Sequence, residues 1–124
     1  MNDLFEYMPL ACSIGSKIFA CHGGIGSRIN KFSDIENLKR PIIIPAEVTT
    51  LEHQIVMDLL WSDPTDHEDE TGVVQNTERD PTGSLSIVKF GPDRIEKFLK
   101  TNYHSLILRS HGIAKAGFEK FAEA

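Results

Sequence analysis

Two segments of the chain place a histidine next to glycine directly after an apolar run. His22 stands between Ile18–Cys21 and a glycine pair, and His111 follows Leu106–Leu108 closely and precedes a single glycine. A strand delivers its last side chain to a sheet edge in a fixed direction, and glycine lets the backbone turn and a ligand approach. A neutral imidazole held in this way is a good metal ligand. The alternative is that each histidine only packs or hydrogen-bonds at a strand end, because a single His-Gly-Gly does not establish a site.

Arg79 and Asp63 are the next candidates for chemistry. Arg79 lies in an acidic stretch, and its planar, permanently charged donors would suit phosphate oxygens. The alternative is a solvated arginine paired with Glu78 or Asp80. Asp63 belongs to the segment Trp61–Pro64, which could equally be a helix stop with a buried tryptophan. The remaining histidines stand in polar or helix-facing surroundings and are treated as ordinary; they are His53, His67 and His104.

The two cysteines raise a third chemistry. Cys12, Cys21, His22 and His111 could together bind zinc, but their spacing matches no structural-zinc pattern. Both cysteines lie in apolar, strand-like runs, where they could be buried neighbours. Two thiols make no disulfide framework, so a reducing compartment is expected, either the cytoplasm or the nucleus.

The elements that must position these residues are short. The runs Leu10–Ile14 and Lys17–Cys21 predict a β-hairpin across Gly15-Ser16, because glycine supplies the positive φ of a tight turn. Helices are expected over residues 33–39, with Ser33 and Glu36 as a capping box, over residues 50–61, and after Gly91. Further strands are expected at 85–90, 105–109 and 117–121, and residues 63–84 read as a long loop. This order favours an α/β sandwich over a doubly wound parallel sheet.

Composition limits the classes of partner. The 124 residues fit one domain, and 40% apolar with 25% charged residues is typical of a globular chain. The net charge of −5 argues against nucleic acid. No apolar run is long enough to span a bilayer, and Asp3 and Glu6 argue against a signal peptide, so no membrane partner is expected.

Taken in order, the motifs resemble the two-metal phosphoprotein phosphatase family of serine/threonine phosphatases. The matching segments are KIFACHGG at 17–24, IENLKRP at 35–41, MDLLWSDP at 57–64, KFG at 89–91 and LILRSH at 106–111. The resemblance runs from about Phe5 to Phe121. The sequences of the segments FEYMPLA, HGGIG and FGPDRI most resemble those of the branch whose members carry kelch repeats, although the chain contains no kelch repeat.

The resemblance implies a fold and a set of roles. The fold would be the C-terminal portion of a calcineurin-like metallophosphoesterase β-sandwich flanked by helices. His22 and His111 would ligate one of two divalent transition metals (Mn, Fe or Zn), Arg79 would bind the substrate phosphate, and Asp63 would line the cleft. In the family, the metals bridge a hydroxide that attacks phosphorus in a phosphoserine or phosphothreonine of a phosphoprotein.

The departures from the family pattern predict an incomplete catalytic domain. The earlier motifs D-x-H, G-D-x-x-D-R-G and G-N-H-E are absent, and the sequence ends before the final S-A-P-N-Y-type loop. Catalytic metal sites use at least three protein ligands, so residues 1–124 are expected to bind metal weakly or not at all and to be inactive alone. The missing N-terminal half is then an expected partner. Two alternatives are an interaction module that self-associates through exposed strands, and an unrelated small metal-binding domain that uses His22 and His111.

Overall fold

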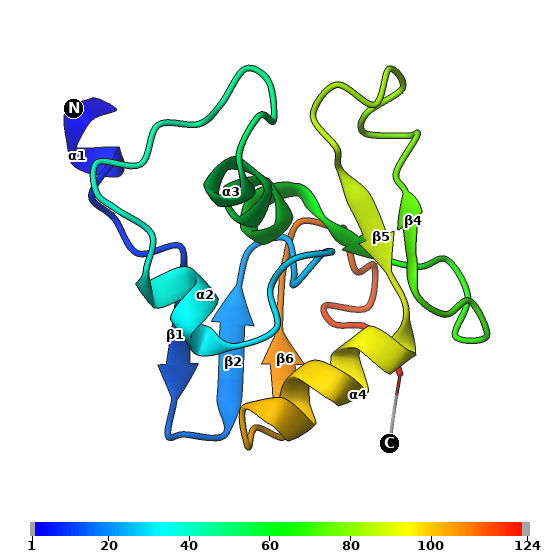
Figure 1. Cartoon of the computed structure of the whole chain (residues 1–124). Coiled ribbons are helices and arrows are strands. Elements are labelled where there is room, and N and C mark those ends of the chain that lie inside the picture. The colour runs from blue at the N-terminus through cyan, green and yellow to red at the C-terminus, as the bar shows by residue number, and fades with distance from the viewer. Residues whose placement is uncertain (1, 123–124) are drawn as a thin grey trace.

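The two apolar runs that precede the histidines form neighbouring strands, the central strand and one edge strand of a three-stranded sheet (Figure 1). The computed structural model describes residues 2–122, which form four helices and six strands. The helices are α1 (Asn2–Phe5), α2 (Phe32–Glu36), α3 (Leu51–Trp61) and α4 (Pro92–Thr101). The strands are β1 (Ala11–Ile14), β2 (Ile18–Cys21), β3 (Asp63–Pro64), β4 (Val73–Gln75), β5 (Val88–Phe90) and β6 (Leu106–Leu108).

The first sheet has the order β1-β2-β6 and contains the predicted hairpin. β1 and β2 are antiparallel, and Gly15 and Ser16 between them have φ values of 56° and 54°, so the glycine is used where the prediction placed it. β2 and β6 are parallel, with Phe19 opposite Ile107. The predicted hairpin and the predicted strand near Ser105–Arg109 are therefore confirmed.

The second sheet has the order β3-β5-β4 and shows that the prediction for residues 63–84 was wrong in part. β3 pairs with β5 in parallel, and β4 pairs with β5 antiparallel, so this segment holds two short strands as well as loops. Only the pairing with β5 reveals them, because two or three residues among Asp, Pro, Gly and Thr carry no alternating pattern.

Two further local predictions were wrong. Helix α2 begins at Phe32, and Asp34 caps it by accepting from the amides of Asn30 and Lys31 at 2.8 Å each, so Ser33 is not the cap. Among residues 109–122 the structure has no strand at 117–121. Gly117 instead closes a turn onto the carbonyl of Ala114 (3.0 Å) at a φ of 91°, outside the extended region.

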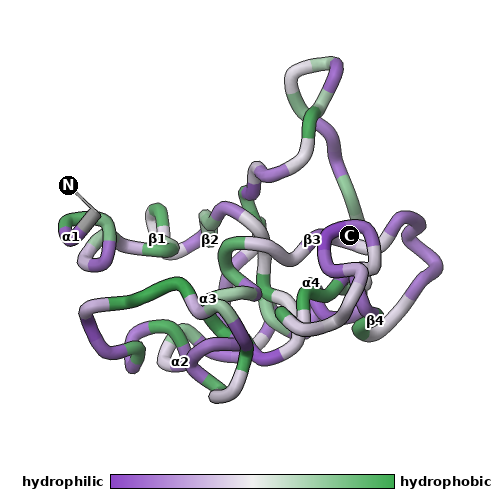
Figure 2. Tube along the Cα trace, turned by 90° about the horizontal axis from the view of Figure 1, so that it is seen from above, coloured by the Kyte–Doolittle hydropathy of each residue, from purple (hydrophilic) through white to green (hydrophobic). Residues whose placement is uncertain are grey.

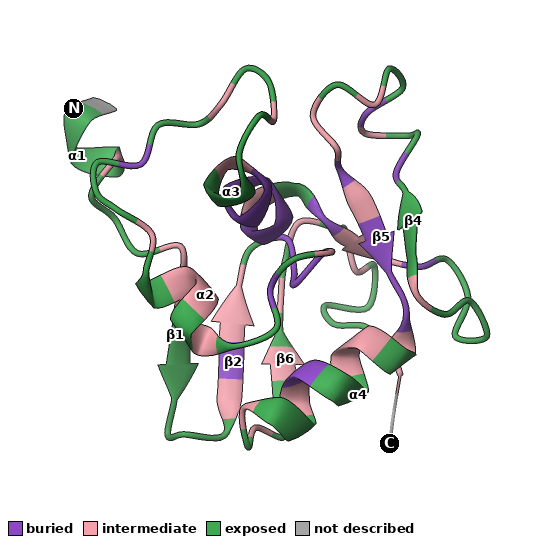
Figure 3. Ribbon diagram, viewed as in Figure 1, coloured by how far each residue is buried: buried purple, intermediate pink, exposed green. Residues whose placement is uncertain are grey.

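Helix α3 begins and ends as the sequence predicts. The Thr50 side chain accepts from the amide of His53 (3.1 Å), which caps the helix, and Ser62 leaves the helix in an extended conformation that leads into β3. Residues 54–59 of this helix are buried (Figure 3). Because the helix is held in the core, the start of β3, which follows it, has a fixed position.

The core lies on one face of the first sheet. Phe19 of β2 contacts Phe32 of α2 and Phe98 of α4, with ring centroids 5.5 and 4.9 Å apart. The same cluster of buried side chains extends to α3 and β5 through Ile25, Ile29, Ile55, Leu59 and Phe90. The sheets and helices are thus joined in one α/β unit, which confirms the predicted fold class at this level.

The opposite face of the first sheet is open. Ile14, Leu106 and Leu108 are 48%, 48% and 54% exposed, and β1 is largely exposed (Figure 3). Hydrophobic residues are spread over many elements along the chain (Figure 2), and none of the described helices is long and apolar enough to cross a membrane.

Candidate functional site

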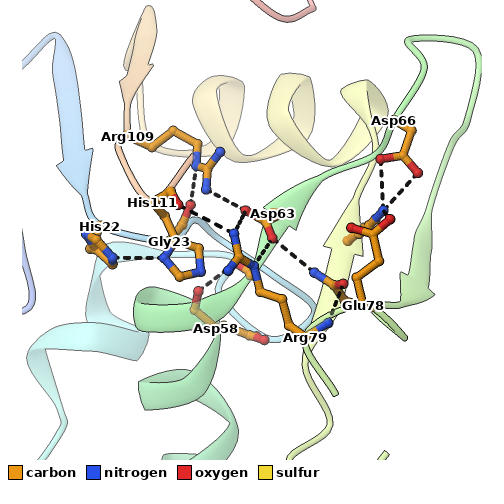
Figure 4. Close-up of polar contacts among 12 residues, drawn as sticks. His22, Gly23, Asp58, Asp63, Asp66, Glu78, Arg79, Arg109 and His111 are labelled. Carbon is orange, nitrogen blue, oxygen red and sulfur yellow. Dashed lines mark hydrogen bonds and ion pairs between the residues drawn. The ribbon is translucent and has the colours of Figure 1, made fainter. Parts of the chain in front are cut away.

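The parallel pairing of β2 with β6 brings the two predicted histidines into contact. Since both strands run in the same direction, their C-terminal ends lie at the same sheet edge, and the amide of Ser110 donates to the carbonyl of His22 (3.1 Å). The nitrogens Nδ1 of His111 and Nε2 of His22 are 2.9 Å apart, and the ring centroids are 4.7 Å apart (Figure 4). The Ser110 hydroxyl lies 2.9 Å from Nδ1 of His22.

His111 is held in an unusual backbone conformation. Its φ is 70°, and the amide of Gly112 donates to the carbonyl of Ser110 across it (2.8 Å), so the chain makes a tight three-residue turn. Non-glycine residues at positive φ are uncommon, and such strain clusters at functional sites. Because of this turn, the chain does not continue in the direction of β6, and the imidazole of His111 points toward His22 at the end of β2.

The imidazole of His111 also has an unsatisfied atom. Its Nε2 is buried without a hydrogen-bond partner, although the residue as a whole is partly exposed. Burial lowers the pKa of His111, and the positive charge of Arg79 lowers it further. A neutral imidazole with a free nitrogen lone pair is the form that ligates metals. The ring of Trp61 packs edge-on against the imidazole of His111, with ring centroids 5.5 Å apart. Trp61 is 39% exposed, so it is not the buried tryptophan that the alternative interpretation placed at the end of the helix.

Asp63 and Arg79 meet directly beside the histidines. Arg79 donates from Nε to one oxygen of Asp63, and its Nη2 lies 3.4 Å from the other oxygen and 3.4 Å from the carbonyl of His111. Arg109 donates to the same carboxylate from Nη2 (2.8 Å), as Figure 4 shows. The structure therefore gathers all four sequence-predicted site residues into one cluster and adds Arg109.

The charge state of Asp63 follows from these partners. Burial on its own would raise the pKa of Asp63, but the hydrogen bond from Arg79 and the charges of Arg109 and Arg79 outweigh it and lower the pKa. Asp63 is therefore ionised at neutral pH. One carboxylate between two guanidinium groups leaves a net positive charge beside the histidine pair.

Asn76 and Asp80 hold the loop that carries Arg79, and the sequence interpretation missed both. Asn76 is fully buried, donates to Asp63 (3.0 Å), and accepts from the amide of Arg79 (3.3 Å). Asp80 is also buried and accepts from the amides of Leu85 and Ile87. Asn and Asp commonly bind nearby backbone in turns, and this property was the only available signal. Asp80 therefore binds its own loop, so the alternative that pairs Arg79 with Asp80 is not observed.

Asp58 of α3 plays the corresponding part for the glycine-rich segment after His22. Its buried carboxylate accepts from the amides of Ser27 (2.8 Å) and Arg28 (2.9 Å) and from the side chain of Gln54 (2.8 Å). Burial is the main cause that raises the pKa of Asp58. The amide of Gly23 donates to the carbonyl of Leu59 (2.7 Å), so the turn that follows His22 is fixed against the end of α3.

The histidine pair fits part of a metal site. Two nitrogens at about 2.1 Å from one ion, at right angles, lie about 3 Å apart, close to the 2.9 Å between Nδ1 of His111 and Nε2 of His22. The orphaned Nε2 of His111 is on the other side of its ring from Nδ1, so it cannot bind the same ion as the histidine pair. Within residues 2–122, however, no group of three or more His, Cys, Asp or Glu side chains is placed to hold a metal ion. The pair supplies two ligands, and a complete shell needs others.

The cysteines are not part of this cluster. Cys12 is exposed and Cys21 partly buried, and both are free thiols. Cys12 lies opposite Ala20 and Cys21 opposite Ala11 in the antiparallel pair, so their side chains point to opposite faces of the sheet. The idea that they are buried neighbours was therefore wrong.

The fold and the placement of these motifs match a known family. The model of the calcineurin-like phosphoesterases matches residues 1–112, and the chain belongs to this family.

Two relatives agree with the family assignment. The chain is 45% identical over 123 residues to "Serine/threonine-protein phosphatase BSL2" of Arabidopsis thaliana. This match covers 99% of this chain and 11% of that protein. A solved structure of a protein serine/threonine phosphatase from Saccharomyces cerevisiae, described as similar to human phosphatase PP5, has a TM-score of 0.67 and 30% sequence identity. The match covers 89% of this chain and 30% of the yeast chain. The chain therefore spans less than a third of either relative.

Proposed function

We propose that residues 1–124 form part of the catalytic domain of a serine/threonine protein phosphatase and contribute one side of its active site. His22 and His111 provide metal ligands, Arg79 binds the substrate phosphate, and Asp63 lines the cleft. The observation that carries the proposal is the contact between His22 and His111 at the ends of parallel strands, with Arg79 beside them. Membership of a family of phosphoesterases supports it.

The residues of the chain itself would bind and orient the substrate. The excess positive charge of Arg79 and Arg109 over Asp63 attracts the phosphate of a phosphoserine or phosphothreonine, and a planar guanidinium can donate parallel hydrogen bonds to two of its oxygens. The neutral state of His111, favoured by burial, leaves its nitrogens free to ligate. When bound, two divalent metals would supply charge neutralisation and a hydroxide nucleophile. Manganese, iron and zinc all accept imidazole ligands, so the donors do not select among them.

The same proposal includes that the chain alone is inactive. Two imidazoles are fewer than the three protein ligands that catalytic sites of this kind use, and the described residues contain no larger ligand group. We propose that the remaining ligands come from the N-terminal half of a phosphatase catalytic domain, which makes that half the required partner.

Complementation tests this function. Residues 1–124 are mixed with a separately produced N-terminal half of a phosphatase catalytic domain in the presence of Mn²⁺, and phosphate release from a phosphoserine peptide is measured. We expect activity only in the mixture, and none after His22→Ala or His111→Ala. His67→Ala is the matched control, because His67 is exposed, and should retain the activity. If the His22→Ala and His111→Ala mixtures are as active as the unsubstituted one, the assignment of the site is wrong.

A non-catalytic role is the second candidate. The exposed apolar side chains of Ile14, Leu106 and Leu108 on the outer face of the first sheet favour an interaction module that associates with another copy or with another protein. A mixture that binds the N-terminal half but never gains activity would support this candidate.

The setting and the finer family placement are also proposals. A cytoplasmic or nuclear location is supported by two free thiols, of which Cys21 has its pKa raised to about 12 by burial, so that it stays protonated. Placement in the kelch-repeat branch is supported by the wording of the motifs and by the 45% identity to the Arabidopsis phosphatase.

A further inference from the structure

Arg109 connects three segments that the proposed function needs to keep together. It follows β6 and lies two residues before His111. Its Nε donates to the carbonyl of Gly23, which directly follows His22, and its Nη2 donates to Asp63 (2.8 Å). Figure 4 shows this guanidinium next to the histidine pair, with its hydrogen bond to Asp63, and the Arg109 side chain is 21% exposed.

The first consequence of these contacts is geometric. The Gly23 carbonyl belongs to the peptide next to His22, so fixing its direction limits the rotation of the backbone that carries the imidazole. The amide of Gly23 is already held by the carbonyl of Leu59 (2.7 Å). With both polar groups of Gly23 bonded, the turn has one orientation, and His22 meets His111 at 2.9 Å.

The second consequence is electrostatic. Asp63 accepts from Arg79, Arg109 and Asn76. With Arg79 as its only cationic partner, the pair would be neutral and Arg79 would have little charge left to attract an anion. The second guanidinium satisfies the other carboxylate oxygen, so the group of three charged side chains keeps one positive charge.

We propose that Arg109 is a positioning residue, which aligns His22 through Gly23 and shares Asp63 so that Arg79 remains available to a phosphate. This inference rests on the proposed phosphatase function. Arg109 makes its contacts with protein groups, so it acts through His22 and Arg79 and is not itself assigned to the substrate.

Imidazole NMR spectra of the complete 124-residue chain test the geometric part without a metal or a substrate. In Arg109→Met we expect the nitrogen signals of His22 and His111 to move toward those of a freely rotating, tautomer-averaged imidazole. Arg94→Met is the matched control, because Arg94 also donates to backbone carbonyls, those of Gly26 (3.2 Å) and Ile29 (2.9 Å), and its hydrogen bonds do not involve either histidine. It should lower stability and leave both imidazole signals in place.

Arg109→Lys keeps the experiment decisive if Arg109→Met does not fold. A lysine can donate to one of the two acceptors, so we expect its imidazole signals to lie between those of the parent chain and of a free imidazole. Unchanged signals in the folded Arg109 variants, or equal shifts in Arg94→Met, would overturn the proposal.

Titration with inorganic phosphate tests the electrostatic part. We expect Arg109→Met to bind phosphate about tenfold more weakly, because Asp63 would then neutralise Arg79 and the excess positive charge would be lost. Arg94→Met should bind phosphate as the parent chain does. If the parent chain itself does not bind phosphate, the proposed role of Arg79 fails, while the imidazole spectra still decide whether Arg109 positions His22.

Discussion

At the scale of single residues, the candidate site is a set of groups whose partners define their charge. Asp63 is kept ionised by two arginines, and His111 is kept neutral mainly by burial. Lys89 is buried and forms an ion pair with Asp66 (2.8 Å); the hydrogen bond that Lys89 donates to Asp66 is the main cause that raises the pKa of Lys89. Next to the histidines, the carboxylate of Asp63 is shared by Arg79 and Arg109, so this group keeps one positive charge.

The lowered pKa of Asp63 predicts a pH-dependent stability difference. A carboxylate with a lower pKa in the folded state stabilises the fold above its unfolded value of about 3.8, and this stabilisation disappears as the pH falls through the folded value. Asp63→Asn should therefore lower the free energy of unfolding at pH 7, and the gap to the parent chain should narrow below pH 3.8. Urea denaturation at a series of pH values measures this gap. A gap of constant size across that range would show that the charge of Asp63 does not stabilise the fold.

At the scale of elements, the short segments that follow the strands fix the position of the site residues. The glycine pair after His22 passes so close to α3 and β5 that side chains are excluded. A Cβ at Gly23 would lie 2.7 Å from the amide nitrogen of Trp61, and one at Gly24 would lie 2.2 Å from the ring of Phe90. Here glycine is required by close approach to neighbouring elements and not by a positive φ.

A pair of glycine substitutions tests this packing. Gly24→Ala should lower the free energy of unfolding by about 1–3 kcal/mol or more, because it overpacks the core against Phe90. Gly112→Ala is the control at the other histidine, since its Cβ would meet only the Arg109 side chain, at 4.0 Å. Thermal or urea unfolding of the two variants measures the difference. Equal stability of both would mean that Gly24 is not confined by Phe90.

At the scale of the whole molecule, the chain leaves apolar surface uncovered. The face of the first sheet that points away from the core presents Ile14, Leu106 and Leu108, all about half exposed. Sheet faces of this composition are normally buried against another layer. This uncovered face and the small share of its relatives that the chain spans both agree with the proposal that residues 1–124 are one part of a larger catalytic domain.

Self-association of the isolated chain is the expected outcome. Sedimentation equilibrium should show concentration-dependent oligomers for the parent chain, and Leu106→Lys with Leu108→Lys should shift it toward monomer by placing charges on the apolar face. Val74→Lys is the control, because Val74 is similarly exposed (47%) but lies in the second sheet. A parent chain that stays monomeric at all concentrations would contradict this use of the face.

Local sequence signals were enough to predict the hairpin at Gly15-Ser16, the extent of α3, and His22 and His111 as residues that follow strands. These predictions follow from turn chemistry and hydrophobic periodicity, which depend on a few neighbouring residues. The three-dimensional fold was needed to show that β2 and β6 are parallel neighbours, which brings His22 into contact with His111, 89 positions further along the chain. It alone revealed β3 and β4, and placed Arg109 on Gly23 and Asp63, because pairing across the chain depends on packing that no local pattern encodes.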